Sequence, residues 1–382
     1  MKRYLSAREV TELLGIAPQT LYAYVSRGLI RSEAGEGRAR RYLAEDVMRL
    51  KNKRDPARLA EDAAQTALRW GTPVLDSALT LITGETVYYR GHDVGELAQT
   101  ATLEQVAGLL WLGELAALPA AEPFPPPPLD SSLPIIQRLI IALAAQNDLA
   151  AYDHQPARVA ETGMRLLHLM TAVMGGTDSG SAAERLGAAW GVAPRLLDAA
   201  LILVADHELN ASAFTARVVA STDATPHAAV IGGLAAMSGT RHGGNIDRTV
   251  ALLREVGEAR YARPVIAERL RRGERIPGLG HRLYPNGDPR AALLLKLIRQ
   301  HYDLSLSDAV IAEAQAAIGR APNVDMALAA LEYEARLPRG SGLALFALGR
   351  TVGWIAHIIE QYQADELIRP RARYTGVQPL LE

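Results

Sequence analysis

The chain has 382 residues, of which 49% are hydrophobic and 22% charged, a composition typical of folded rather than disordered proteins. At roughly 100–200 residues per domain, this length predicts two or three domains. The chain has no cysteine, which excludes a disulfide framework, a thiolate zinc site, an iron–sulfur cluster and a cysteine nucleophile. The N-terminus lacks a signal-peptide core, and no run of about 18 uninterrupted apolar residues predicts a membrane span, so we expect a cytoplasmic protein.

Charge is distributed unevenly along the chain. Residues 1–54 hold 12 Lys and Arg against 6 Asp and Glu, a balance of +6, whereas the remainder carries −7. A small basic segment on a mildly acidic body indicates that the first segment meets a polyanion. The alternative is chance clustering of surface arginines.

The basic segment is predicted to form two short helices joined by a tight turn. Ser6 begins a capping-box pattern ahead of an apolar helical stripe, Gly15 suits the end of that helix, and Pro18 suits the first turn of the next. The Gly- and Arg-rich stretch 31–41 predicts a hairpin wing, and residues 46–50 should start a third helix.

The order of small motifs in this segment points to a known DNA-binding fold. The matching stretches are Tyr4-Leu5-Ser6, Leu14-Gly15, Thr20-Leu21-Tyr22, Gly28-Leu29-Ile30 and Arg40-Arg41-Tyr42 followed by Asp46-Val47. Through them, residues 1–54 resemble the MerR-like winged helix-turn-helix family. The resemblance implies that the second helix enters the major groove of double-stranded DNA and that the wing touches phosphates.

This resemblance supplies candidate DNA contacts. The candidates for the groove are Gln19, Thr20, Tyr22 and Arg27, and those for the phosphates are Arg38, Arg40 and Arg41. The alternative is a docking module that has kept the fold and lost its DNA.

The rest of the chain has a different texture. Residues 55–69 are polar and are predicted to form a linker. From residue 70 onward, long apolar-periodic segments are rich in Ala and Leu, which are strong helix formers. Residues 87–89 form one short strand candidate, and the prolines of 123–128 predict an extended loop. We therefore predict a mainly α protein, with a small winged helix-turn-helix head and an all-α body.

Three histidine-bearing stretches stand apart from this background, at 206–212, 241–244 and 277–282. Taken singly, a lone histidine is more often structural, and an acid before a helix, such as Asp325, is usually an N-cap. Glycines beside the histidines of the second and third stretches allow a ligand to approach the backbone closely. No His-Glu-x-x-His pattern is present, so no metal site is predicted.

Six motifs match one enzyme family in sequence order. They are Tyr-Arg-Gly-His-Asp at 89–93, Asp-His-Glu-Leu-Asn-Ala-Ser from 206, Pro-Gly-Leu-Gly-His-Arg-Leu-Tyr from 277 with Asp-Pro-Arg from 288, Asn-Val-Asp at 323–325, Arg-Thr-Val-Gly-Trp-Ile-Ala-His at 350–357, and Arg-Pro-Arg-Ala-Arg-Tyr-Thr-Gly at 369–376. On these motifs, residues 70–376 resemble citrate synthase. The resemblance implies a large domain (70–244 and 346–382) and a small domain (245–345) that close on each other.

The resemblance also implies an activity. The enzyme would condense acetyl-CoA, or another short acyl-CoA, with oxaloacetate or a related 2-oxo acid to give citrate or 2-methylcitrate plus CoA. The CoA thioester is a co-substrate, and no permanently bound cofactor is implied. Proton removal from the weakly acidic thioester methyl group needs a base and a stabilised enolate oxygen. The resemblance assigns the base to Asp325, the hydrogen bond to the thioester oxygen to His242, and polarisation of the ketone to His281.

Binding roles follow in the same way. The substrate carboxylates need the paired donors of guanidinium, which the resemblance assigns to Arg290, Arg350 and Arg369, with His207 as a neighbouring ligand. In the family, the arginine matching Arg369 comes from the other subunit, so a homodimer is implied. The residues implied to bind CoA are Arg275, Ile276, Pro277, Gly278, Leu279 and Gly280.

The sequence departs from the family pattern at a few positions. Where citrate synthases commonly read His-Gly-Gly-Ala-Asn-Glu, this chain has Asn245, Ile246 and Asp247 after the two glycines, and Ala327 stands where a polar residue is common after the catalytic acid. Together with the basic head, these changes motivate an alternative function, in which the chain is a DNA-binding transcriptional regulator whose body senses a CoA thioester or tricarboxylate.

Overall fold

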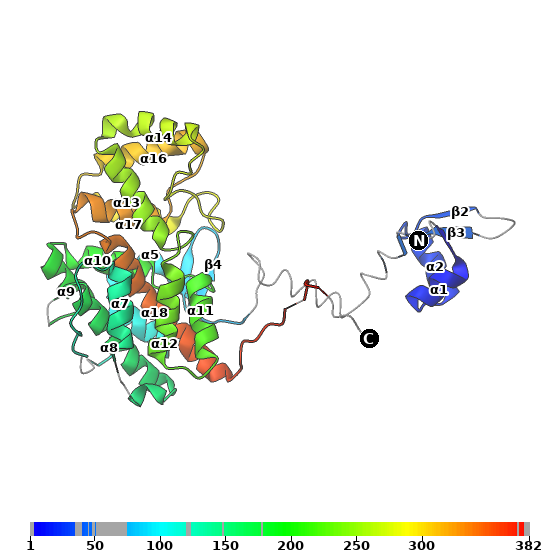
Figure 1. Cartoon of the computed structure of the whole chain (residues 1–382), viewed down its shortest axis with the longest axis horizontal. Coiled ribbons are helices and arrows are strands. Elements are labelled where there is room, and N and C mark those ends of the chain that lie inside the picture. The colour runs from blue at the N-terminus through cyan, green and yellow to red at the C-terminus, as the bar shows by residue number, and fades with distance from the viewer. Residues whose placement is uncertain are drawn as a thin grey trace. The chain divides into compact units, whose positions relative to one another are not determined.

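A computed structural model gives the fold of the chain in two compact units, residues 1–76 and 77–382. It describes residues 4–34, 40–44, 46–47, 50, 75–119, 124–146, 149–176, 179–372 and 374–377. The predicted linker at 55–69 and the candidate phosphate contact Arg38 lie outside the described residues. The head and the body are described separately below (Figure 1).

The head consists of two helices beside a three-stranded antiparallel sheet. Its elements are β1 (Tyr4–Ser6), α1 (Ala7–Leu14), α2 (Pro18–Ser26), β2 (Ser32–Ala34) and β3 (Arg40–Leu43), with sheet order β1-β3-β2. The predicted capping box is present, because the Ser6 hydroxyl accepts from the Glu9 amide while the Glu9 carboxylate accepts from the Ser6 amide. Gly15 ends α1 in the left-handed conformation, and Pro18 occupies the first turn of α2.

A small apolar core holds the head together. Val10, Leu21, Ile30 and Tyr42 are each at most 1% exposed and contact one another. The predicted helix-turn-helix and hairpin wing are therefore confirmed, and the sheet gains β1, a strand that the sequence pattern did not predict. Its three residues are too short for a period-two pattern to stand out.

The body is mainly helical, as predicted. After β4 (Thr80–Ile82), β5 (Val87–Tyr89) and β6 (His92–Asp93), which form one antiparallel sheet, every named element is a helix. The α-helices are α5 (Val94–Thr100), α6 (Leu103–Leu112), α7 (Ile135–Ala144), α8 (Pro156–Val173), α9 (Ala182–Trp190), α10 (Pro194–Leu203), α11 (Ala211–Ala220), α12 (Pro226–Met237), α13 (Gly244–Val256), α14 (Ala262–Arg271), α15 (Pro289–Ile298), α16 (Ser305–Ile318), α17 (Val324–Glu334) and α18 (Ser341–Ala364). Two short 3₁₀ turns, η1 (Leu149–Tyr152) and η2 (Ala259–Tyr261), complete the named elements.

Helix α18 is the central element of the body. It packs against α6, α8, α10, α11, α12 and α17, and Figure 1 shows it running among the helices of the body. By length and composition α18 could cross a membrane, but its apolar window is fully buried among these neighbours. It therefore acts as a core helix of the body.

The loop that contains Ala205 and Asp206 can lie directly against α18 because residue 353 of this helix is glycine. A Cβ at Gly353 would lie 2.3 Å from the carbonyl oxygen of Ala205 and 2.5 Å from Oδ1 of Asp206. The Gly353 amide instead donates to the Ala205 carbonyl at 3.0 Å. This contact brings the loop after α10 directly against α18, and that loop carries His207.

The helices α13 to α17 form a second group within the body. Helix α13 packs on α17 and α16, α14 packs on α16, and α15 packs on α17. Figure 1 shows α13, α14, α16 and α17 gathered at one end of the body. The start of α17 carries Asp325, and the loop before α15 carries His281.

Candidate active site

The first part of the site is built around the start of α11. Asn210 caps this helix by accepting from the amides of Ser212 and Ala213. The Ser212 hydroxyl lies 2.7 Å from Asn210 Oδ1, 2.8 Å from His242 Nε2 and 3.2 Å from the indole nitrogen of Trp354. A hydroxyl has one proton and an indole N–H can only donate. Ser212 therefore gives its proton either to Asn210 or to His242, and this choice sets which ring nitrogen of His242 carries the proton.

The second part is the N-terminus of α17. Asn323 caps it by accepting from the amides of Asp325 and Met326, so the aspartate is in the first turn and is not the cap. Its Oδ2 accepts a 2.7 Å hydrogen bond from the Asn245 side chain. Burial raises the pKa of Asp325 to about 6, against the opposing effect of the Asn245 hydrogen bond and of Arg290 and Arg350. A carboxylate with such a pKa is suited to act as a base near neutral pH.

The third part is the loop that carries His281. Nδ1 of His281 accepts from the Leu283 amide at 3.2 Å, so the neutral ring carries its proton on Nε2 and can donate it. Its ring lies edge-on to that of His207, with centroids 5.2 Å apart. Nε2 of His207 is 2.7 Å from the Tyr284 hydroxyl. The two histidines and the tyrosine thus form one cluster.

The histidines of the site are held neutral at pH 7. Burial together with Arg350 lowers the pKa of His242 to about 4. Burial and Arg290 lower the pKa of His281 to about 4, although Asp288 opposes them. Burial, Arg290 and Arg350 place the pKa of His207 well below its usual range. These histidines can therefore donate hydrogen bonds to a developing negative charge without being imidazolium ions.

Arg290 lies in the first turn of α15 and is 4% exposed. Its Nε and Nη2 donate to the two carboxylate oxygens of Asp288 at 3.0 and 2.8 Å. Oδ2 of Asp288 also accepts from the Val324 amide at 3.1 Å. The same carboxylate therefore fixes the guanidinium and ties α15 to the start of α17, beside Asp325.

Arg350 is a buried cation of α18, with 1% of its surface exposed. Its Nε donates to the Val204 carbonyl at 2.8 Å, and its guanidinium carbon lies 4.9 Å from the centre of the Phe346 ring. Within the described residues, no carboxylate lies within ion-pair distance of this guanidinium. Burial lowers its pKa to about 10, which still leaves it charged at pH 7. A buried cation without a carboxylate partner is suited to bind an anionic ligand.

The loop 275–280 lies between α14 and His281. Arg275 is exposed, whereas residues 276–279 are buried. The Asn323 amide donates to the Gly278 carbonyl at 3.0 Å, and the Gly280 amide donates to the Ala321 carbonyl at 2.8 Å. Gly278 has φ of 77°, and a Cβ there would lie 2.8 Å from the Thr249 side chain. The loop is therefore fixed against α17 and α13, and it needs glycine at this position.

Comparison with known proteins agrees with this geometry. Residues 67–127 and 128–371 match the family described as citrate synthase, C-terminal domain, and residues 4–55 match a helix-turn-helix domain. Citrate synthase 2 of Bacillus subtilis is 31% identical over 355 residues, covering 80% of this chain and 94% of the relative. The chain belongs to the citrate synthase family. Another member, the 2-methylcitrate synthase of Shewanella oneidensis, is 30% identical over 346 residues, covering 78% of this chain and 91% of the relative.

A solved citrate synthase has the same body fold. The enzyme of Thermoplasma acidophilum, in a ternary complex with carboxymethyl coenzyme A and oxaloacetate, superimposes with a TM-score of 0.69 at 25% identity. The match covers 82% of this chain and 96% of that one. The predicted citrate synthase resemblance, the mainly α fold and the helix-turn-helix head are confirmed.

The predicted catalytic and substrate-binding residues of the body fall into two groups. One group lies together, linked by the contacts described above or by mutual effects on pKa; it contains His207, His242, His281, Arg290, Asp325 and Arg350. Arg369 is apart from them, because it is exposed on the extended segment after α18, which Figure 1 shows in red. Within one chain, the structure does not bring Arg369 to the other residues of this citrate synthase site.

Several residues of the site belong to the citrate synthase motifs, although the resemblance assigns them no role. Asp288 orients Arg290 through two hydrogen bonds, Tyr284 contacts His207, and Ser212 contacts His242. Their signal was their place within the citrate synthase motifs, but their partners are distant in sequence. Phe346, which packs on Arg350 and His242, carried no sequence signal.

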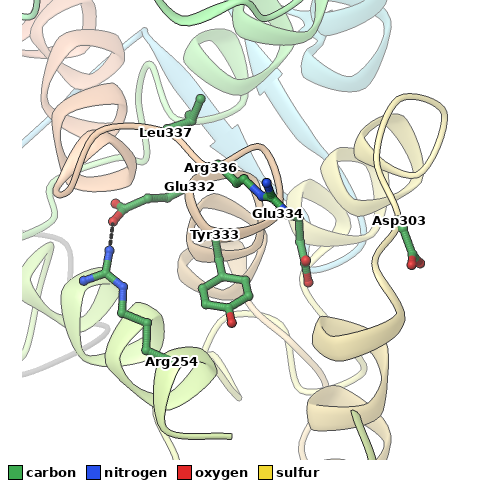
Figure 2. Close-up of a pocket in the computed structure, with 7 residues that line it drawn as sticks. All are labelled: Arg254, Asp303, Glu332, Tyr333, Glu334, Arg336 and Leu337. Carbon is green, nitrogen blue, oxygen red and sulfur yellow. Dashed lines mark hydrogen bonds and ion pairs between the residues drawn. The ribbon is translucent and has the colours of Figure 1, made fainter. Parts of the chain in front are cut away.

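A separate polar pocket of about 580 Å³ lies elsewhere in the α13–α17 group. It is lined by Arg254, Asp303, Glu332, Tyr333, Glu334, Arg336 and Leu337, and Figure 2 shows Arg254 paired with Glu332. Glu332 accepts from the amides of Gly340 and Gly342 at the start of α18. This carboxylate therefore stabilises the start of α18. None of the residues that line the pocket is a predicted site residue of the citrate synthase resemblance. Among the described residues, no three His, Asp or Glu side chains gather as metal ligands would.

Proposed function

We propose that this chain condenses a short acyl-CoA with oxaloacetate or a related 2-oxo acid, forming citrate or 2-methylcitrate and releasing CoA. The observation that carries the proposal is the Arg350 guanidinium, which is buried without a carboxylate partner in the described part of the chain. It lies close enough to His207 to lower the pKa of that histidine, as Arg290 and His281 also do. Two buried cations beside neutral histidines suit a small dicarboxylate that also carries a ketone.

Each reacting group has a place in this proposal. Asp325 takes the methyl proton of the thioester, and His242 donates a hydrogen bond to the thioester oxygen as it becomes an enolate oxygen. His281 donates its Nε2 proton toward the ketone oxygen while the new carbon–carbon bond forms. Water then cleaves the thioester and releases CoA. For His242 to donate from Nδ1, the Ser212 hydroxyl must donate to Nε2.

The loop 275–280 is proposed to receive CoA. Its buried turn is fixed to the start of α17, and this places the loop next to Asp325. We further propose that α13 to α17 belong to a small domain (245–345) that closes on a large domain (70–244 and 346–382). Closure would exclude water while the thioester intermediate exists.

Arg369 is proposed to complete the site of a partner subunit in a homodimer. Its exposed place on the segment after α18 leaves it available to another copy of the chain. Dimerisation and the cytoplasmic location are expectations of the same proposal. If the chain forms this homodimer, the Arg369→Ala variant should have a higher KM for the 2-oxo acid than the wild type, because the paired donors of one guanidinium no longer bind a substrate carboxylate.

The direct test is an assay of CoA thiol release with a panel of acyl-CoAs and 2-oxo acids. We expect turnover with acetyl-CoA or propionyl-CoA when oxaloacetate is present, and none without the 2-oxo acid. One methylene in a pocket changes binding by only about 1–3 kcal/mol, so both acyl-CoAs should react at different rates. Absence of thiol release with every pair would contradict the proposal.

A second function is proposed for the head, because its exposed side chains suit a duplex. Gln19, Tyr22 and Arg27 are exposed on or beside α2, and Tyr22 keeps 59% of its surface exposed. Arg40 and Arg41 are exposed on β3, and Thr20 is half-buried. An exposed aromatic residue beside arginines is typical of a nucleic-acid-binding face. The head would thus bind double-stranded DNA, and the body would act as a sensor of a CoA thioester or tricarboxylate.

DNA binding should show the salt dependence of phosphate contacts. We expect the full chain to bind a mixed-sequence 30-base-pair duplex at low salt, with an affinity that falls steeply as salt rises. The Arg40→Ala/Arg41→Ala variant should lower the slope of log K against log salt by about 1 per lost contact. Arg8→Ala is the matched control, since Arg8 is exposed on α1. Fluorescence anisotropy would measure both, and an unchanged slope in the double variant would contradict the phosphate role.

A further inference from the structure

Asn245 occupies a position between two groups of the proposed reaction. Its side-chain Nδ2 donates to Asp325 Oδ2 at 2.7 Å. Its backbone amide donates to the His242 carbonyl at 2.9 Å. One residue in the first turn of α13 therefore links the loop of His242 to the first turn of α17.

The position of Asn245 is itself fixed. Its carbonyl accepts from the Thr249 hydroxyl at 2.8 Å, and Thr249 is fully buried. The Thr249 side chain lies 2.8 Å from the position that a Cβ of Gly278 would occupy. The Asn245 side chain thus points to Asp325 from a turn that also contacts the loop 275–280.

The hydrogen bond has a definite chemical sense. Since Nδ2 of an amide can only donate, it stabilises the ionised form of Asp325 and fixes Oδ2, leaving Oδ1 to accept a proton. The residues after the aspartate are Met326 and Ala327, which offer no side-chain donor. Asn245 stands where the family resemblance leads us to expect alanine, so this chain provides from α13 a polar support for the carboxylate.

We propose that Asn245 is a positioning residue that holds Asp325 ionised and oriented for proton abstraction, and that it couples this base to His242. The inference deepens the proposed condensation and rests on the assignment of Asp325 as its base. The other charged groups that face the Asp325 carboxylate are Arg290 and Arg350, which also favour its ionised form, and Asp288, which opposes it. They come from α15, α18 and the residue before α15 and remain in place when Asn245 is changed.

The test is the pH dependence of kcat/KM for the acyl-CoA in Asn245→Ala and Asn245→Asp. In Asn245→Ala, the acid limb should move upward by about one pH unit, because one hydrogen bond to the charged form is lost. Asn245→Asp keeps the side-chain shape and places a second carboxylate beside the first, so its limb should move further upward. Arg248→Ala is the control, since Arg248 is exposed on the same helix, and its limb should match that of the wild type.

A purely structural role would give another result. Loss of packing alone would lower kcat/KM at every pH and leave the acid limb of the pH profile at the same pH. If the acid limbs of both Asn245 variants coincide with that of the wild type, the inference is overturned. The carboxyl ¹³C signal of Asp325, followed by NMR in the full chain, gives the same titration without turnover. A signal that titrates at the same pH with and without Asn245 overturns the inference in the same way.

The experiment separates this inference from the proposed function. If Asp325→Asn has no effect on thiol release, the assignment of the base fails and Asn245 loses its role with it. If Asp325→Asn is inactive and both Asn245 limbs coincide with the wild type, the proposed function stands and only the role of Asn245 is overturned.

Discussion

Replacement of Asp325 by asparagine is expected to slow CoA release by about 10²–10⁴-fold, the usual contribution of a positioned general base. The amide has the shape of the carboxylate but cannot accept the methyl proton. The helix start does not depend on this side chain, because Asn323 caps α17, so the variant should fold. Initial rates at saturating concentrations of both substrates measure the effect, and circular dichroism checks the fold.

The same carboxylate should set the acid side of the pH profile. Burial raises the pKa of Asp325 to about 6, so the wild-type rate should fall as pH drops through 6 and the base becomes protonated. His242 and His281 stay neutral down to about pH 4 and do not contribute to this limb. Asp153→Asn, at an exposed carboxylate, is the control and should behave as the wild type. An unchanged rate in Asp325→Asn would remove this carboxylate from the reaction.

Local signals in the sequence were sufficient for most of the fold. The capping box at Ser6, the terminating Gly15 and the Pro18 start predict α1 and α2. Each of these residues satisfies the hydrogen-bonding or backbone-angle requirement of a helix end that lies within a few residues of it in the sequence. The periodic Ala and Leu residues predict a helical body, because helix propensity and a 3.6-residue hydrophobic period are also local properties of the sequence. Strands β4 and β6 were not predicted, since strands of three and two residues carry too little pattern.

The motifs predicted which residues form the candidate site, but they did not predict the hydrogen-bond partners of those residues. The motif of Asp325 pointed to a base, yet nothing near it in sequence shows that Asn245, 80 residues earlier, donates to it. The Asp-Pro-Arg motif contains Arg290 and its partner Asp288, but not the link from Asp288 to the start of α17. Such contacts arise only when helices pack, so periodicity and spacing along the chain cannot show them.

The Asp206–His357 pair shows the same limit. Both residues lie within the citrate synthase motifs, and Asp206 directly precedes His207, the proposed substrate ligand. In the structure Asp206 is buried, with Oδ1 3.2 Å from His357 Nε2 and Oδ2 2.5 Å from the Thr80 hydroxyl. His357 Nδ1 also lies 3.6 Å from Glu360. The pair therefore links the loop before His207 to α18.

Removal of the imidazole is expected to destabilise the body strongly. His357→Ala would leave the buried Asp206 carboxylate without its cation, and breaking a buried pair in this way costs about 3–5 kcal/mol. The free energy of unfolding from urea titrations measures the loss. The double variant Asp206→Asn/His357→Ala removes both charges together and should lose less stability than the sum of the losses in Asp206→Asn and His357→Ala. Additive losses would show that the pair does not act as a unit.

The effect should also depend on pH in a defined direction. Burial alone would lower the pKa of His357, but Asp206 and Glu360 outweigh it and raise the pKa to about 9. A group with a raised pKa stabilises the fold fully below its unfolded value of about 6.5 and loses that stabilisation as pH rises through 9. The difference in unfolding free energy between wild type and His357→Ala should therefore be large at pH 6 and shrink by pH 9.5. A difference that stays constant over this range would mean that His357 is neutral in the folded body, and the contact with Asp206 would then have no ionic component.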